Sequence, residues 1–173
     1  MRQTRTVDVT ELRARQAPLK QRYRDDPASA RTPVGASADW RDPGITATVD
    51  GWLGPVRTGL HVATGGDGAD ACSADLLLQA LLGCAGVTLR SVATAMRLDL
   101  RDVRLRADGV YDARGTLGLD RDVPVGVQDV VVSVEVATDA DDATLARLAE
   151  LTERYCVVAR SLAEPPRFVI RRV

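Results

Sequence analysis

Aromatic residues are scarce in this chain of 173 residues, since Phe, Trp and Tyr together make up 3% of it. Proteins that bind single-stranded nucleic acids need such rings as stacking platforms, so the composition argues against that class of partner. The formal net charge is −1, from 23 basic and 24 acidic residues, which provides no electrostatic attraction to DNA or to an anionic membrane. The chain has the length of one domain with an extra arm, and its core must consist mainly of Leu, Val and Ala.

Metal-ligating residues are also few. His61 is the only histidine, and no pair of the three cysteines has the C-x-x-C spacing, so we expect no zinc site. We therefore expect His61, near the end of a predicted strand, to have a structural role. The glycine-rich segment 64–72 precedes no Lys-Ser or Lys-Thr pair and does not match a phosphate-binding loop.

A secretory leader is not evident, because residues 1–16 lack an apolar signal-peptide core. The longest apolar stretch, residues 73–96, contains Asp75, Gln79 and Arg90, so we interpret it as a buried helix and not a membrane span. We expect a cytoplasmic protein, in which cysteines are more often reduced, catalytic or redox-active than cross-linked.

The order of predicted elements indicates an α+β fold with one long apolar helix inside. Residues 1–40 form an arm and linker, with a helix that Pro18 breaks or kinks, and residues 41–173 form the main domain. In the main domain the patterns predict two strands in 44–63, a helix over 73–97, strands over 100–115 and 127–138, a second helix from 138 to 156 and a last strand over 167–173. Ser73 is the expected N-cap of the long helix, and Thr138 or Asp139 that of the second.

Two cysteines are candidate reactive residues. Cys84 lies in the long helix between Gly83 and Gly86, which permit another backbone to approach closely. Cys156 ends the second helix near Arg154 and Arg160, and cations lower the pKa of a thiol. By spacing alone, the more frequent role for either cysteine is that of a small buried hydrophobe.

Three segments, "CSADLLLQALLGCAGV", "GVYDARGTLG" and "LTERYCVVARSL", resemble the OsmC/Ohr family of cysteine-dependent peroxidases. The resemblance covers about residues 44–173 and matches Cys84 and Cys156 to the two family cysteines. It implies an intertwined homodimer whose central helices are wrapped by antiparallel sheets. It also implies that Cys84 reacts with an organic hydroperoxide and that Cys156 resolves the product into a disulfide. A dithiol acts as reductant, and no metal or organic cofactor is required.

The sequence departs from the family pattern at the start of the long helix. The peroxidase branches have a Pro-Glu pair there, and the Glu orients an Arg that activates the thiolate; Ser73 and Ala74 stand at these positions. The nearest acid, Asp75, would lie about 13 Å from Cys84 and on the opposite face of a straight helix. Arg41 is the best match for the activating Arg, and Arg57 is the alternative.

Three functions remain open from the sequence. The first is thiol-dependent reduction of hydroperoxides through Cys84 and Cys156. The second is a homodimer of the same fold that binds a small apolar or electrophilic ligand, or that senses oxidants stoichiometrically. The third is a purely structural protein with inert cysteines. Cys72 is then either an alternative resolving thiol or a bystander. Its position before the long helix can favour a thiolate, but the family pattern has no cysteine there, which favours a bystander.

Overall fold

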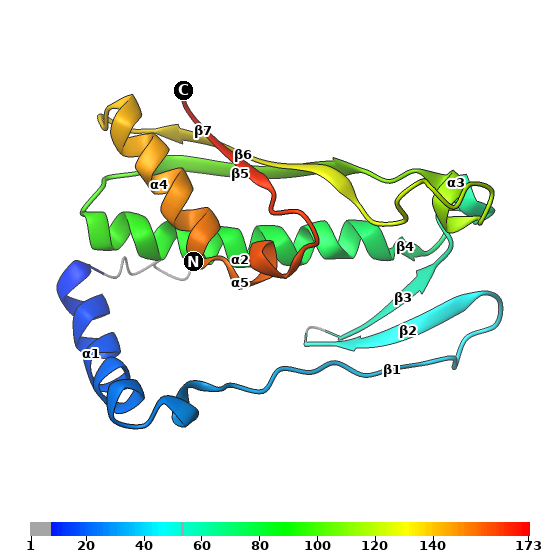
Figure 1. The fold of residues 1–173 in the computed structure, drawn as a ribbon, viewed down its shortest axis with the longest axis horizontal. Helices are drawn as coiled ribbons and strands as arrows, with labels where there is room; N and C mark the ends of the chain where they lie inside the picture. Colours follow the sequence, from blue (N-terminus) through cyan, green and yellow to red (C-terminus); the bar gives the residue numbers. More distant parts are fainter. Residues whose placement is uncertain (1–7, 53) are drawn as a thin grey trace.

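The computed structural model describes residues 8–52 and 54–173 and confirms the predicted α+β fold (Figure 1). A long central helix, α2 (Ser73–Met96), lies between two sheets. One sheet has the order β1 (Ala38–Asp39), β2 (Thr46–Gly51), β3 (Gly54–Gly59) and β4 (Ala71–Cys72), and the other β5 (Arg101–Val110), β6 (Gln128–Ala137) and β7 (Arg167–Arg172).

Both sheets are mixed, so the expectation of purely antiparallel sheets is wrong. The pairs β3–β4 and β6–β7 are parallel, and the other strand pairs in the described part of the chain are antiparallel. Parallel neighbours need a crossover connection. For β6 and β7 this connection contains α4 (Asp142–Tyr155) and α5 (Val157–Ser161), which the crossover places against α2.

The core forms where α2 meets this helical crossover and the second sheet. The buried residues of α2 recur every four positions, which gives one face of a helix, and they are Leu81, Ala85, Leu89 and Ala93. Alternate valines of β6 are buried, as the period-two pattern predicts, and they are Val130, Val132, Val134 and Val136. Leu145 and Leu148 of α4 complete the cluster, so α2 is a core helix along this stripe.

The remaining surface of α2 is less covered. By length and composition the helix could cross a membrane, and 28% of its most apolar 18-residue window is buried inside this chain. The buried stripe belongs to the core of the fold, as expected for an internal helix. The rest of its apolar surface is partly or fully exposed in the single chain.

Two helices begin at different residues from those expected. Cys72 and not Ser73 occupies the N-cap position of α2, without a capping hydrogen bond from its side chain. Asp141 caps α4 by accepting a hydrogen bond from the Thr144 N–H at 2.7 Å. Thr138 lies before the start of this helix: its hydroxyl accepts from the Ala140 N–H at 3.3 Å and donates to the Asp99 carbonyl at 2.8 Å, which joins the ends of β5 and β6.

The arm also differs from the expectation. Helix α1 (Val9–Asp25) continues through Pro18 without a break. None of its residues is buried, so the carbonyl group that Pro18 leaves unbonded is open to water. A 3-10 turn, η1 (Pro27–Ala30), follows, and the chain then extends to β1. The first sheet begins at Ala38, two residues before the predicted boundary of the arm.

Candidate functional site: a pair of contacting thiols

The structure brings Cys84 and Cys156 together. Cys84 lies in the middle of α2, and Cys156 lies between α4 and α5, where an extended backbone conformation interrupts the helical run. Both are free cysteines, and hydrogen bonding between the two thiols lowers the pKa of Cys84 and raises that of Cys156. The packing of α2 against α4 and α5 therefore creates a site of two thiols 72 residues apart in sequence.

The surroundings of Cys84 favour its thiolate. Partial burial raises the pKa of the Cys84 thiol, but hydrogen bonds to the sulfur outweigh this effect and hold the pKa below its usual value. The donors are the backbone N–H of Val158, the Cys156 thiol, the backbone N–H of Val157 and the Thr88 hydroxyl, in order of decreasing effect. The site therefore increases the fraction of Cys84 that is a nucleophile at neutral pH.

The surroundings of Cys156 raise the pKa of its thiol and so favour the protonated form. Its side chain is fully buried, and this burial raises the pKa of the Cys156 thiol. The shared hydrogen bond raises it further, because Cys156 must keep its proton to donate to Cys84. The expectation that Arg154 and Arg160 lower this pKa is therefore wrong. The Arg154 guanidinium instead lies over the ring of the exposed Tyr155, 5.6 Å from its centre.

Replacement of Thr88 by valine is expected to raise the pKa of Cys84, because it removes one hydrogen bond to the thiolate and keeps the shape of the side chain. The rate of alkylation by iodoacetamide, measured against pH, reports this pKa. Thr94→Val is the matched control, since the Thr94 hydroxyl lies on the same helix and donates to the Arg90 carbonyl instead. Equal pH profiles for Thr88→Val and the unmodified protein would contradict the assigned hydrogen bond.

One side of the thiol site is open. Cys84 is half-buried, and the neighbouring Val87 is 73% exposed. A side chain at Gly86 would meet Leu105 of β5 at 3.9 Å, whereas at Gly83 it would meet no atom of another described element within 4 Å. The Gly86 neighbour is a side-chain atom at an ordinary contact distance, so the described residues of this chain do not make the predicted close backbone approach at either glycine.

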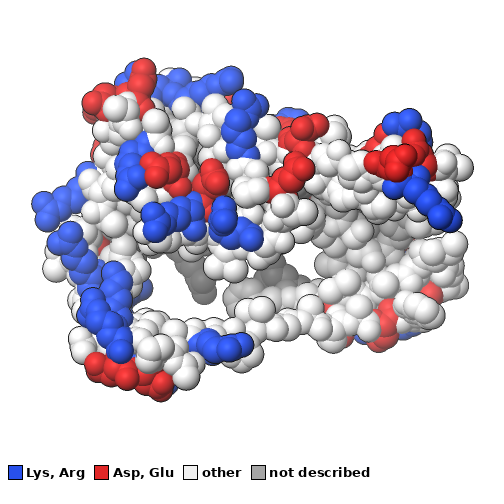
Figure 2. All heavy atoms as spheres, in the orientation of Figure 1, with Lys and Arg blue, Asp and Glu red and all other residues white. Residues whose placement is uncertain are grey.

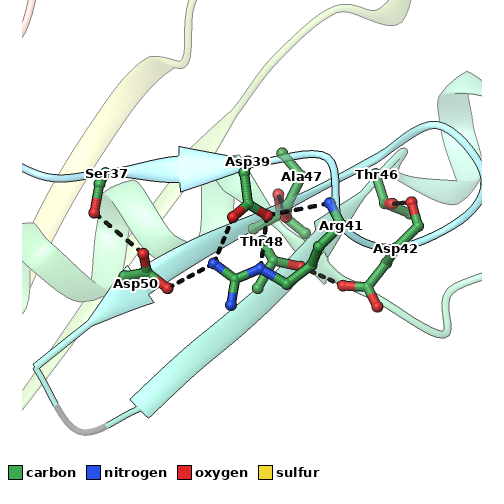
Figure 3. Close-up of polar contacts among 9 residues, drawn as sticks. Ser37, Asp39, Arg41, Asp42, Thr46, Ala47, Thr48 and Asp50 are labelled. Atoms are coloured by element: carbon green, nitrogen blue, oxygen red, sulfur yellow. Dashed lines mark hydrogen bonds and ion pairs between the residues drawn. The ribbon is translucent and has the colours of Figure 1, made fainter.

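Arg41 lies in a separate polar cluster on the first sheet (Figure 3). Its guanidinium donates to Asp39 at 2.6 and 2.7 Å and to Asp50 at 3.0 Å, so Arg41 ties the β1 end to β2. Arg57, the alternative activating residue, pairs with Asp70 at 2.8 Å. Neither Arg41 nor Arg57 is among the groups of this chain whose hydrogen bonds lower the pKa of Cys84.

Asp75 and Cys72 lie at the start of α2, near Tyr111 and away from the thiol pair. The Tyr111 hydroxyl is buried without a hydrogen-bond partner among the described residues. This burial raises the pKa of Tyr111, and the charges of ionised Cys72 and Asp75 raise it further. His61 packs edge-on against the Tyr111 ring at 5.8 Å and accepts a hydrogen bond from the Ala63 N–H, which is a structural role.

The chain positions of Cys72 and Cys84 separate these two thiols. Twelve residues of helix span about 18 Å along the axis, and α2 runs without interruption between them. Cys72 is therefore too far from Cys84 to resolve it within one chain. Residues 8–52 and 54–173 contain no group of three or more His, Cys, Asp or Glu side chains that could hold a metal ion.

Three donors to Cys84 were not predicted as site residues. Thr88 lies one turn after Cys84 on the same face, and this spacing is a usable signal for a side-chain donor. The N–H groups of Val157 and Val158 have no such signal, because every residue except proline carries one. Only the turn at Cys156 aims these two groups at the Cys84 sulfur.

The chain thus combines an α+β fold with a long central helix whose cysteine lies beside a second, buried thiol. The family model described as OsmC-like protein matches residues 66–171, more than half of the chain. The chain therefore belongs to the OsmC-like protein family, as the sequence predicts. A comparison with curated proteins returned no match.

Solved structures support the fold assignment. An OsmC-like protein from Mycoplasma pneumoniae has a TM-score of 0.63 at 11% identity, and the match covers 82% of this chain and 95% of that one. An organic hydroperoxide resistance protein from Elizabethkingia anophelis has a TM-score of 0.66 at 12% identity, covering 83% and 98%. One from Legionella pneumophila has a TM-score of 0.57 at 14% identity, covering 82% and 98%. At these identities the likeness concerns the fold.

Proposed function

We propose that this protein reduces organic hydroperoxides, with Cys84 as the reacting thiol and Cys156 as the resolving thiol. The observation that carries the proposal is the hydrogen bond between the two thiols, together with their opposite pKa shifts. A reacting thiol needs to be a thiolate at neutral pH. A resolving thiol needs to stay nearby and protonated until the first step is complete.

In the first step, the Cys84 thiolate attacks the distal oxygen of the hydroperoxide. The O–O bond breaks, Cys84 is oxidised to a sulfenic acid, and the alkoxide leaves and takes up a proton as the alcohol. In the second step, the Cys156 sulfur attacks the sulfenic sulfur, a disulfide forms and water leaves. A dithiol then reduces the disulfide by exchange and is itself oxidised, so the cycle requires no metal or organic cofactor.

The substrate class follows from the surroundings of the site. Leu81 and Ala85 are buried beside Cys84, and Leu82 and Val158 pack against the same core. An apolar environment of this kind suits an alkyl or acyl hydroperoxide better than the strongly hydrated hydrogen peroxide. The same family includes the two hydroperoxide resistance proteins compared above. The reducing cytoplasm is the proposed location, because it supplies dithiols.

A second candidate function is stoichiometric oxidant sensing or the binding of a small electrophilic ligand. One observation favours it, because Asp39 and Asp50 already engage Arg41, the cation that would activate the thiolate. A sensor would react once and would not need this cation for repeated turnover. The two candidates therefore differ in turnover and not in the identity of the reactive residue.

Turnover of an organic hydroperoxide tests the proposal. The pre-reduced protein, given tert-butyl hydroperoxide and excess dithiothreitol, is expected to consume many equivalents of peroxide per chain and to do so faster than with hydrogen peroxide. Peroxide loss is followed with a ferrous dye assay against a protein-free dithiol control. Consumption of one equivalent only would favour the sensor, and no reaction above the control would exclude both redox functions under these conditions.

We also propose a homodimer. The apolar surface of α2 around Gly83 and Val87 lies open beside Cys84, and a second copy that packs there would exclude water from the thiol site. On the first sheet, Trp40 and Ile45 line an open hollow of about 480 Å³ and are largely exposed. Large apolar side chains so exposed are typical of a surface that a partner covers.

A further inference from the structure

The arm, defined here as residues 8–37, has little support from its own chain. Helix α1 contacts α2 and η1 and has no buried residue. An isolated helix of this length is marginally stable in water, and an internal proline weakens it further. Contacts with another molecule would therefore stabilise α1 in this position.

The arm stands away from the body of the molecule. Residues 31–37 run as an exposed, extended segment from η1 to β1, and Figure 1 shows α1, this segment and α2 as three sides of a frame. Figure 2 shows that the described side chains leave part of this frame open. Val34, on the extended segment, is 96% exposed, which is an unfavourable position for an apolar side chain unless something packs on it.

The total surface area is larger than that of a compact chain of the same mass. A compact monomer of 18.5 kDa is expected to have about 8,200 Å² of accessible surface. This chain has 12549 Å², a surplus of roughly 4,300 Å² over that scaling. Even large obligate interfaces bury about 1,000–2,500 Å² on each partner. The surplus is large enough for an extensive interface that includes the arm as well as α2.

Charge indicates which partner fits. Helix α1 carries five basic and two acidic side chains, a net charge of +3, whereas residues 26–173 carry 16 basic and 21 acidic ones, a net charge of −5. Figure 2 shows the Lys and Arg side chains gathered over α1. The basic arm of one chain is complementary in charge to the acidic body of a second copy. In a two-fold symmetric dimer the same contact forms twice, once from each arm.

We propose that the arm is a clasp for the partner subunit, and that a second copy of this chain fills the frame between α1, the extended segment and α2. The family match begins at residue 66, so the clasp is a feature of this chain outside the matched region. The clasp proposal rests on the proposed homodimer and adds the arm to its interface. Because opposite charges contribute, the dimer is expected to weaken with added salt.

The test uses the full chain with the double substitution Leu19→Asp and Val34→Asp. Both side chains are exposed in the single chain, so the variant is expected to fold, which circular dichroism checks. The dissociation constant of the dimer, from sedimentation equilibrium, is expected to rise at least about tenfold. Val173→Asp is the matched control, because Val173 is exposed but lies at the other end of the sequence, and it is expected to leave the constant unchanged.

Hydrogen exchange supplies a second measurement. Amides of α1 are expected to exchange slowly above the dissociation constant of the dimer and rapidly below it, since the contacts of α1 within its own chain bury none of its residues. Exchange in α1 that does not depend on protein concentration, or a dimer that the double substitution does not weaken, would overturn the clasp and leave the homodimer standing. A wild-type chain that is monomeric at every concentration would overturn both, whereas peroxide turnover is measured separately and decides the thiol chemistry.

Discussion

Replacement of Cys84 by serine is expected to abolish hydroperoxide turnover, with a loss on the order of 10³-fold or more. A serine hydroxyl keeps the size of the side chain and the hydrogen bonds around it, but it has no accessible anion at neutral pH and cannot become a sulfenic acid. The Thr88 hydroxyl and the N–H groups of Val157 and Val158 would then surround an inert group. Peroxide consumption with excess dithiol measures the loss.

Replacement of Cys156 by serine is expected to have a different outcome. The first equivalent of peroxide still reacts, because Cys84 keeps its backbone donors, but the sulfenic acid has no neighbour to form a disulfide with. Dimedone labelling followed by mass spectrometry is expected to detect this sulfenic acid on Cys84. Cys72→Ser is the matched control and is expected to retain turnover, because Cys72 lies at the start of α2 and outside the thiol pair.

Three results would contradict these roles. Turnover that persists in Cys84→Ser would assign the chemistry to another residue. Equal loss of the first-equivalent reaction in Cys84→Ser and Cys156→Ser would show that the two thiols act as one unit from the first step. Retention of full turnover by Cys156→Ser would assign resolution to the external dithiol and not to Cys156.

Replacement of Leu148 by alanine is expected to lower the free energy of unfolding by about 3 kcal/mol, which is the typical effect of a cavity at a fully buried leucine. Leu148 is completely buried in α4 and belongs to the cluster that includes Leu81, Ala85 and Cys156. For a chain of this length the same change lowers the melting temperature by about 6–12 °C. Calorimetry at one fixed protein concentration measures it, because a dimer melts in a concentration-dependent way.

Leu119→Ala is the matched control for this effect. Leu119 is 74% exposed in the connection between β5 and β6, so its truncation is expected to change the stability by less than about 0.5 kcal/mol. If Leu148→Ala is no more destabilising than Leu119→Ala, the packing of α4 on α2 is not the core that the structure describes. That packing also positions Cys156, so a loosened α4 is expected to slow disulfide formation as well.

The sequence predicts β6 and α2 correctly because their apolar residues repeat with the periods of a strand and a helix. The four alternate valines of β6 predict a strand, and the stripe from Leu81 to Ala93 predicts a helix. Neither prediction depends on the tertiary surroundings. Helix ends are less predictable, since several residues compete for the same role. Thr138 is a suitable cap by type, but its hydroxyl bonds to the Asp99 carbonyl in the tertiary structure, and Asp141 takes its place.

The candidate site was also predicted in part from the sequence and in part only from the tertiary structure. The family resemblance and the helical pattern place Cys84 and Cys156 on two elements, but pattern alone does not show that the elements meet. The low pKa of Cys84 depends on N–H groups of Val157 and Val158, which no sequence motif marks. The expected cationic effect at Cys156 fails because neither arginine is among the groups that shift the pKa of this thiol, and burial raises that pKa.

By itself, the sequence determined the fold class, the family, the long apolar helix and the two cysteines worth testing, because composition, periodicity and motif spacing are properties of the chain order. The tertiary structure alone decided in which direction the pKa of each thiol shifts, which arginines are already paired, and that both sheets are mixed. Those facts depend on distances between segments far apart in the sequence. Hydrogen bonds, burial and charge act on a thiol only once the fold has brought their sources to it.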